Sequence, residues 1–236
     1  MKVAAAISVA LAPYLAHATF ALRWYFRNPP PDGLADATFP LLMRSAGHVE
    51  GYFFAYQFQF DNIPNVAYIG IQPRPDYGGR SVVHAAFSSF QGGTETSHPN
   101  CYYGADGGPG VSCAIDVYGD YWHRYNLVVE NIRGTTWRGR LVNEATGQSH
   151  EIGVWTLPRG AGNMQSWGSG FIEHYMHDNC RQWPKIGVTF FEPSSTSTGN
   201  SGSVLDMPTD YGVCRRVENL QVARTDEGFR INYGRA

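Results

Sequence analysis

The stretch from Val49 to Phe90 constrains the fold more than any other part of this chain. It opens with the run VEGYFFAYQFQF, in which large aromatic residues alternate with smaller, polar or second aromatic ones. Successive side chains of a β-strand point to opposite faces, so this alternation predicts a half-buried strand. One face carries the rings of Tyr52, Phe54, Tyr56, Phe58 and Phe60. Five rings on one face are enough to nucleate one sheet of a two-sheet sandwich.

Two further strand-like runs complete this stretch. VAYIGIQPRP follows an Ile-Pro-Asn turn, and RSVVHAAFSSF follows Asp76-Tyr77-Gly78-Gly79, which has the composition of a hairpin turn. Similar runs recur to the end of the chain, with turn residues at a spacing of roughly 8–12 residues, as in sandwiches and barrels. We therefore predict an all-β fold: an antiparallel, jelly-roll-like (concanavalin-like) β-sandwich in a single domain.

Composition agrees with this fold class and limits the partners. The chain has 236 residues, of which only 16% are charged and 27 are glycine, which fits a turn-rich β protein better than a helical one. The net charge of −2 implies no broad basic face, so nucleic acid is not an expected partner. Residues 19–48 show few strand signals and are expected to form an N-terminal extension before a sandwich domain at 49–236. The Ser/Thr/Gly-rich segment 193–203 is expected to be a mobile loop.

The first residues have the pattern of a secretory signal. Lys2 is followed by an apolar run, and Ala16-His17-Ala18 is a small-x-small cleavage site. We predict that residues 1–18 are removed, that the mature chain begins near Thr19, and that the protein is secreted. No other run is long and apolar enough to span a membrane.

Four cysteines fit an extracellular protein with disulfides. Cys101, Cys113, Cys180 and Cys214 allow three connectivities. We favour Cys101–Cys113 with Cys180–Cys214, because the first bond would close a glycine-rich loop and stabilise it by about 3 kcal/mol. A zinc site is less favoured, because no Cys-x-x-Cys pair is present.

An ordered set of short motifs gives the chain a family resemblance. The set comprises Tyr68-Ile69-Gly70-Ile71-Gln72, Phe87-Ser88, Gly108-Pro109-Gly110-Val111-Ser112-Cys113, Tyr121-Trp122-His123-Arg124-Tyr125, Gly153-Val154-Trp155-Thr156-Leu157-Pro158 and Glu173-His174-Tyr175. Between Gly51 and Pro193 the chain thereby resembles a secreted domain-of-unknown-function family, number 3472. Where that family continues from Phe-Ser into Val-Trp-Asp, this chain has Ser89-Phe90-Gln91. The resemblance implies an extracellular β-sandwich, often near carbohydrate-related modules, and implies no reaction.

The favoured function is carbohydrate binding on one face of the sheet. Amide, guanidinium and imidazole groups suited to sugar hydroxyls fall on strands that we expect to be neighbours, and Trp122, Trp137, Trp155 and Trp167 are possible stacking platforms. Most tryptophans of a sandwich lie in the core, so each one alone is better explained by packing. The predicted ligand-binding residues are Gln57, Gln72, Arg74, His84, His123, Tyr125 and Glu173. The predicted partner is a polysaccharide or glycan of the cell wall or extracellular space.

Two other classes of function stay open at this point. A polysaccharide-cleaving enzyme would need convergent titratable groups: Glu173 is the most suggestive carboxylate for a glycoside hydrolase, and Gln72, Arg74, His84, His123 and Tyr125 have the chemistry of a lyase. The strand motifs typical of such enzymes are absent, so the sequence does not decide whether the chain is an enzyme. A structural cell-surface protein is the third class.

No cofactor is firmly expected. Asp106, Asp116 and Asp120 lie in or near glycine-rich loops and could bind Ca²⁺ with backbone carbonyls. Their spacing is not specific for an ion, and solvated turn residues are the favoured explanation.

Overall fold

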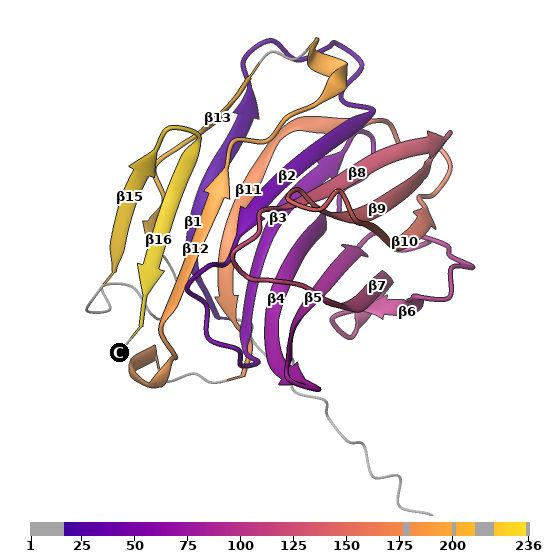
Figure 1. Cartoon of the computed structure of the whole chain (residues 1–236). Coiled ribbons are helices and arrows are strands. Elements are labelled where there is room, and N and C mark those ends of the chain that lie inside the picture. Colours follow the sequence, from indigo (N-terminus) through magenta and orange to yellow (C-terminus); the bar gives the residue numbers. More distant parts are fainter. Residues whose placement is uncertain (1–16, 177–179, 200–201, 211–219, 235–236) are drawn as a thin grey trace, which may run out of the picture.

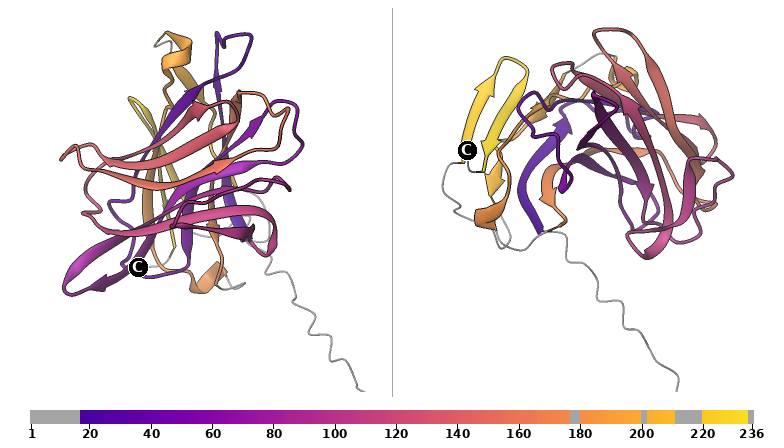
Figure 2. Two further views of the ribbon diagram at one scale, coloured as in Figure 1. Left: turned by 90° about the vertical axis from the view of Figure 1, so that its right-hand side faces the viewer. Right: turned by 60° about the horizontal axis from the view of Figure 1, so that its bottom comes forward.

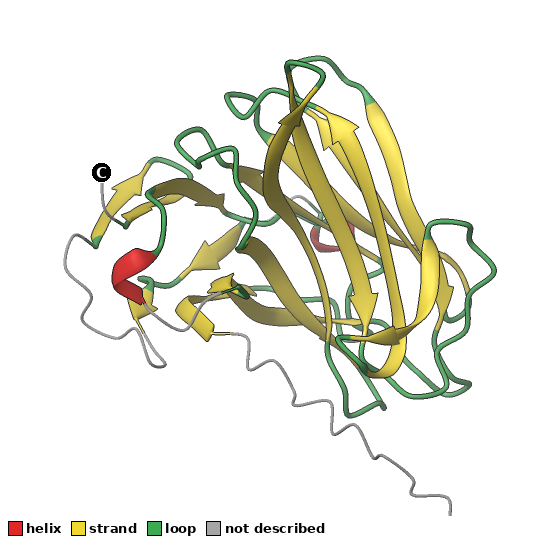
Figure 3. Cartoon of the chain, turned by 90° about the horizontal axis from the view of Figure 1, so that it is seen from below, coloured by secondary structure: helices red, strands yellow, loops and turns green. Residues whose placement is uncertain are grey.

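The protein is a β-sandwich of two antiparallel sheets. The computed structural model describes residues 17–176, 180–199, 202–210 and 220–234. Strands dominate, and the helical elements among these residues are the two 3-10 turns η1 (Cys180–Gln182) and η2 (Thr196–Thr198) (Figure 3). The two sheets lie face to face, as Figures 1 and 2 show. The predicted fold class is confirmed.

The larger sheet contains the stretch that the sequence singled out. Its strand order is β13-β1-β11-β3-β4-β5-β7-β6, and β14 also pairs with β1. The bounds are β1 His17–Phe26, β3 Tyr52–Phe60, β4 Ala67–Tyr77, β5 Arg80–Ser89, β6 Cys101–Ala105, β7 Gly108–Tyr118, β11 Met164–His174, β13 Ser203–Leu205 and β14 Thr209–Asp210. The three predicted strands between Val49 and Phe90 are therefore β3, β4 and β5, paired in that order.

The smaller sheet covers one face of the larger one. Its order is β10-β9-β8-β2-β12-β16-β15. The bounds are β2 Asp36–Leu42, β8 Tyr125–Arg133, β9 Thr136–Asn143, β10 Ser149–Thr156, β12 Ile186–Phe191, β15 Gln221–Thr225 and β16 Gly228–Tyr233.

The main core fills the space between the two sheets. All five rings predicted for one face of β3, from Tyr52 to Phe60, are at most 1% exposed. They pack against rings from the other sheet: Phe39 on β2 stacks on Phe58, and Phe190 on β12 packs against Tyr56. Alternation in the sequence thus predicted the inward face of this strand, because burying these rings is what brings the sheets together.

The segment before Val49 is part of the sandwich and is not an extension. β1 lies between β13 and β11 of the larger sheet, and β2 lies between β8 and β12 of the smaller one. Phe20, Leu22 and Trp24 of β1 are at most 3% exposed. The expected boundary near residue 49 is therefore wrong. β1 does alternate, with Phe20, Leu22, Trp24 and Phe26 buried, whereas β2 has only 7 residues and less regular alternation. Pairing with distant segments is what places both strands in the sheets.

The bond Cys101–Cys113 forms as predicted, but not across a loose loop. The two residues are direct partners across the hairpin of β6 and β7, with Cα atoms 3.9 Å apart. Its sulfur atoms face the smaller sheet, where a Cβ on Gly153 of β10 would lie 2.5 Å from either one. Cys214, the predicted partner of Cys180, lies outside the described residues, as do residues 1–16 of the predicted signal. No helix of the described chain is long and apolar enough to cross a membrane.

Candidate functional site

The candidate site lies on the outer face of the larger sheet, the face turned away from the smaller sheet. Strand register places five outward-facing residues in one line across neighbouring strands, which we call the outer row. From β11 to β7 they are Glu173, Phe53, Gln72, His84 and Asp116. Neighbouring strands are about 4.8 Å apart, so Glu173 and Gln72 face outward about 10 Å apart with the Phe53 ring between them.

A small aromatic cluster forms the floor beside the outer row. Phe53 and Ala55 are at most 2% exposed although they point away from the main core. Tyr68, Phe171 and Tyr175 pack over them, and the Phe53 ring lies 5.1 Å from that of Tyr68 and 5.8 Å from that of Phe171. Gly70 belongs to this floor because a Cβ there would lie 2.6 Å from the Phe53 ring. The cluster removes water from the polar groups at its edge.

Glu173 is the group most affected by this burial. Removal from water, and secondarily the negative charge of Asp106, raise the pKa of its carboxyl from 4.5 to about 7. Burial disfavours the charged form of a carboxylic acid, which is why the proton is held to higher pH. Asp106 itself accepts a hydrogen bond from Tyr68 Oη at 3.4 Å, and burial raises its pKa as well. A carboxyl with a pKa near 7 can both release and take up a proton close to neutral pH.

Gln72 is held in a fixed orientation by a chain of two hydrogen bonds. Arg74 Nη1 donates to Tyr175 Oη at 2.7 Å, and Tyr175 Oη donates to Gln72 Oε1 at 3.1 Å. Since the amide oxygen is the acceptor, the Nε2 group is left as a donor. No hydrogen bond within the described residues uses Gln72 Nε2. The amide is therefore available to donate to a ligand on the outer face.

The other end of the outer row opens into a hollow. His84 Nδ1 lies 2.8 Å from Asp116 Oδ1, and burial together with the charge of Arg74 lowers the pKa of His84. The imidazole is thus neutral at neutral pH and donates from Nδ1. Arg74 and Asp116 line a hollow of about 470 Å³, together with Glu50, Asp76 and Tyr77 among others. A ligand on the outer row has room to extend there.

The structure brings together only part of the predicted site. Gln72, Arg74, His84 and Glu173 lie on or beside the outer row, and Gln57 lies further along β3 on the same face, opposite Tyr68. His123 does not belong to it: its Nδ1 accepts a hydrogen bond from Asn143 Nδ2 at the end of the smaller sheet.

Tyr125 does not belong to the site either. It is 1% exposed between the sheets, and its hydroxyl donates to the carbonyl of Asp120. Both this residue and His123 precede or begin β8, a strand of the other sheet, which alternation alone could not reveal.

Sequence reasoning missed three contributors to this face. Tyr175, Tyr68 and Asp106 were not selected, although they orient Gln72 or influence Glu173. The Glu-x-Tyr spacing of Glu173 and Tyr175 was a usable signal, because residues two apart share a face. Asp106 comes from the hairpin turn between β6 and β7 and carried no such signal.

Of the four tryptophans considered as stacking platforms, Trp137 and Trp155 are fully buried, whereas Trp122 and Trp167 are 61% and 49% exposed.

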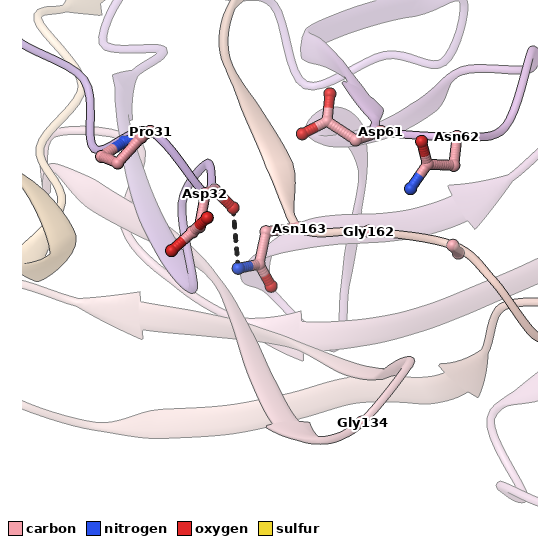
Figure 4. A pocket seen from close by; sticks show the side chains of 8 residues that line it. Pro31, Asp32, Asp61, Asn62, Gly134, Gly162 and Asn163 are labelled. Carbon is pink, nitrogen blue, oxygen red and sulfur yellow. Dashed lines mark hydrogen bonds between the residues drawn. The ribbon is translucent and has the colours of Figure 1, made fainter.

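No metal centre is apparent in the part of the chain that the structure describes. There, no group of three or more His, Cys, Asp or Glu side chains is placed to hold an ion. The three aspartates considered for Ca²⁺ lie apart, since Asp106 bonds Tyr68, Asp116 bonds His84 and Asp120 accepts from the Trp122 amide. Another hollow is lined by Asp32, Asp61, Asn62 and Asn163, where Asn163 Nδ2 donates to the Asp32 carbonyl (Figure 4). Calcium binding stays a prediction.

Comparison with known proteins yields structural likeness alone. No family model matches the chain and no curated protein matches it, so the resemblance to family 3472 stays a prediction. A crystal structure of Scytalido-glutamic peptidase with a peptide-based transition-state analogue has a TM-score of 0.53 and 12% identity, covering 92% of this chain and 99% of that one. A second structure of that peptidase, with a transition-state analogue inhibitor, has a TM-score of 0.52 and 13% identity over the same coverage.

A further similar structure is SCP-B, a member of the eqolisin family of peptidases, in complex with the tripeptide Ala-Ile-His. It has a TM-score of 0.47 and 10% identity, again covering 92% of this chain and 99% of that one. The two Scytalido-glutamic peptidase structures, at 12% and 13% identity, establish a shared β-sandwich fold alone. This likeness transfers no residue role.

Proposed function

We propose that the outer face of the larger sheet is the active site of a hydrolase that cleaves peptide bonds. The observation that carries the proposal is Glu173, a carboxyl whose pKa burial and Asp106 raise to about 7, in one row with an oriented glutamine amide. Perturbed carboxyls beside oriented donors are typical of catalytic sites. The choice of peptide as substrate is supported by the likeness of the fold to Scytalido-glutamic peptidase.

The geometry suggests how the two groups share the reaction. The Glu173 carboxylate takes a proton from a water molecule, whose oxygen forms a bond to the substrate carbonyl carbon. Gln72 Nε2 donates to the oxygen that becomes negative, a contribution worth on the order of 10²–10³ in rate where such donors have been removed. The carbon–nitrogen bond then breaks, and Glu173 returns its proton to the leaving amine. A pKa near 7 suits a group that must act as base and then as acid.

Cleavage of an unfolded protein substrate tests this proposal. We expect Glu173→Gln to lower the rate at least 10³-fold and Gln72→Ala at least 10²-fold. Glu95→Gln is the control for the first, because Glu95 is exposed in a loop and only its backbone forms hydrogen bonds. The pH–rate profile should show an inflection near 7. In Asp106→Asn this inflection should shift to lower pH, since removing the negative charge of Asp106 lowers the pKa of Glu173. Full activity of Glu173→Gln would rule the mechanism out.

Glycan binding is the second candidate, and exposed rings on the same face favour it. Trp167 on β11 and Tyr102 on β6 are 49% and 60% exposed, and both belong to the outward-facing set of their strands. The half-buried Gln57 lies on the same face and can bond a sugar hydroxyl, whereas Ser88 and Ser112 are buried and form a hydrogen bond with each other. A panel of neutral and acidic polysaccharides distinguishes the candidates: retention without release of reducing ends supports binding, and release supports a polysaccharide-cleaving enzyme.

We also propose that the protein is secreted. The predicted signal supports this, and a formed disulfide together with no membrane-spanning helix among the described residues is compatible with it. Mass spectrometry of the mature chain would show an N-terminus near Thr19 if the predicted cleavage occurs, and an intact Met1 terminus would contradict it.

A further inference from the structure

Two adjoining hollows at one end of the sandwich share an arginine and a tryptophan. The first, of about 610 Å³, is lined among others by Arg44, His48, Arg80, Trp122 and His123. The second, of about 460 Å³, is lined by Arg44, Trp122, Arg230 and five uncharged residues. Arg44 and Trp122 belong to both, so the two hollows meet at this pair. We call them together the end pockets.

The end pockets concentrate positive charge on a protein whose net charge is −2. Three arginines line them, and Asp120 is the one carboxylate in the two sets of lining residues. Asp120 already accepts a hydrogen bond from the Trp122 amide at 2.9 Å. Within the described chain, none of Arg44, Arg80 and Arg230 forms an ion pair with a carboxylate. Unpaired guanidinium groups gathered in a hollow favour an anionic ligand.

Two of the guanidinium groups are held in place by aromatic rings. Arg44 Cζ lies 3.7 Å from the centre of the Trp122 ring, and Arg80 Cζ lies 3.8 Å from that of Tyr118. Stacking uses the flat face of a guanidinium and leaves its N–H groups free at the edge, where a carboxylate or sulfate binds them in pairs. These arginines are therefore partly preorganised for an anion, which reduces the entropy lost on binding.

The remaining lining residues point to a sugar rather than a simple anion. Hydroxyl and amide side chains predominate among them: Ser45, Ser81, Asn143, Thr146, Gln148, Thr189 and Asn232. Groups of this kind bond to sugar hydroxyls, and the 61%-exposed Trp122 gives an apolar ring for a sugar face. His123 accepts a hydrogen bond from Asn143 at Nδ1, which leaves Nε2 as a further donor.

We propose that the end pockets bind an acidic oligosaccharide, one bearing uronate or sulfate groups, with at least one anionic group in each hollow. Arg44 lies at the junction and contacts the ligand together with Trp122. Arg80 serves the first hollow and Arg230 the second. This site is separate from the outer row and does not depend on the hydrolase proposal, because none of its charged residues belongs to that row.

Calorimetric titration of the folded, oxidised protein tests the site, with a hexamer of α-1,4-linked galacturonate as the probe. A glucose hexamer tests the need for charge, and a hexaglutamate peptide tests the need for sugar. We expect the uronate hexamer to bind and the other two to bind at least tenfold more weakly. A sulfated glucose hexamer distinguishes carboxylate from sulfate as the preferred group. No binding of either acidic sugar at millimolar concentration would overturn the proposal, as would equal binding of hexaglutamate.

Matched variants locate the site. The pair Arg44→Gln/Arg230→Gln should weaken uronate binding at least tenfold, and so should Trp122→Ala. The pair Arg133→Gln/Arg159→Gln removes the same charge from exposed turns elsewhere, and should change binding less than twofold. An equal loss in both pairs would show that only net charge matters and would overturn the assignment. The far-UV circular dichroism spectrum and the melting temperature, measured on the same samples, confirm that each variant is folded whether or not the protein cleaves peptides.

Discussion

The two faces of the larger sheet use the same strands for different purposes. On β3 the inward face buries Tyr52, Tyr56 and Phe58 against the smaller sheet. The outward face of the same strand buries Phe53 and Ala55 beneath a few side chains, next to a carboxyl and an amide. Inward burial supplies the main driving force for folding. Outward burial opposes the ionisation of Glu173, and unfavourable environments of this kind are typical of functional sites.

The largest difference between the faces should appear when one ring is removed from the inward side. Phe58 stacks on Phe39 and packs edge-on against Phe60. Phe58→Ala should lower the free energy of unfolding by about 3–5 kcal/mol, because it removes buried area and leaves a cavity. Its neighbour Gln57 points outward, and Gln57→Ala should cost less than about 1 kcal/mol. Urea denaturation measures both values, and similar losses at the two positions would contradict the comparison.

Breaking the disulfide should have the next largest effect, because the bond reinforces the inward side. Replacing Cys101 and Cys113 by serine removes a constraint across 12 residues of sequence and should cost about 3 kcal/mol. For a chain of this size that loss lowers the melting temperature by roughly 6–12 °C. Calorimetry of the wild type and the double variant measures the difference without reductant, which would also reduce the bond predicted for Cys180. A Glu95→Gln sample treated identically controls for handling, and an unchanged melting temperature in the double variant would contradict this account.

The outward side should respond to pH in a manner set by Glu173. Its carboxyl pKa rises from 4.5 in the unfolded chain to about 7 in the folded one, so the folded state holds an extra proton between these values. Stability is therefore greatest below about pH 4.5 and falls as pH rises toward 7, by about 2–3 kcal/mol from this group. Glu173→Gln cannot ionise, so its stability relative to wild type should increase by that amount between pH 4 and pH 8.

Denaturation at the two pH values measures this change. Glu95→Gln should show no such trend, because its carboxyl is exposed. A stability difference between wild type and Glu173→Gln that is the same at pH 4 and pH 8 would show that the carboxyl is not buried as described.

The smallest expected effect concerns the orientation of Gln72. Tyr175→Phe keeps the ring over the outward cluster but removes the hydroxyl that joins Arg74 to Gln72. The loss should be about 1–2 kcal/mol of stability, because the hydroxyl takes part in two hydrogen bonds. If Tyr175 positions the amide, the rate of peptide cleavage should fall through kcat while the pH inflection of Glu173 stays in place. An inflection that moves with this variant would show that Tyr175 acts on Glu173 instead.

Local patterns were sufficient to predict much of the fold. Alternation identified β3, β4 and β5, and it identified the rings that face the core. Spacing identified Cys101 and Cys113 as partners. The segments before Val49 were misread, because β1 and β2 were expected to lie outside the domain and belong to its two sheets. The Ser/Thr-rich segment was expected to be mobile, and part of it forms the η2 turn.

Residues 195–197 of that Ser/Thr-rich segment bind one distant carboxylate. Asp36 accepts hydrogen bonds from the Thr196 amide, the Thr196 hydroxyl and the Ser197 hydroxyl, and Ser195 caps the η2 turn. The partners are about 160 residues apart in sequence. The composition of the segment predicted flexibility, because composition alone cannot reveal that a distant residue, Asp36, accepts hydrogen bonds from it.

The sequence by itself determined the class of fold and the side of β3 that faces the core, because both follow from periodicity along neighbouring residues. It also supplied Gln72 and Glu173 as candidates through their chemistry. Only the tertiary structure decided that these two share one row, that Tyr125 belongs to the core, and that Asp106 and Tyr175 act on the site. Strand order and register bring together residues more than 60 positions apart, and burial then sets the pKa of Glu173. Neither property can be read from adjacent residues.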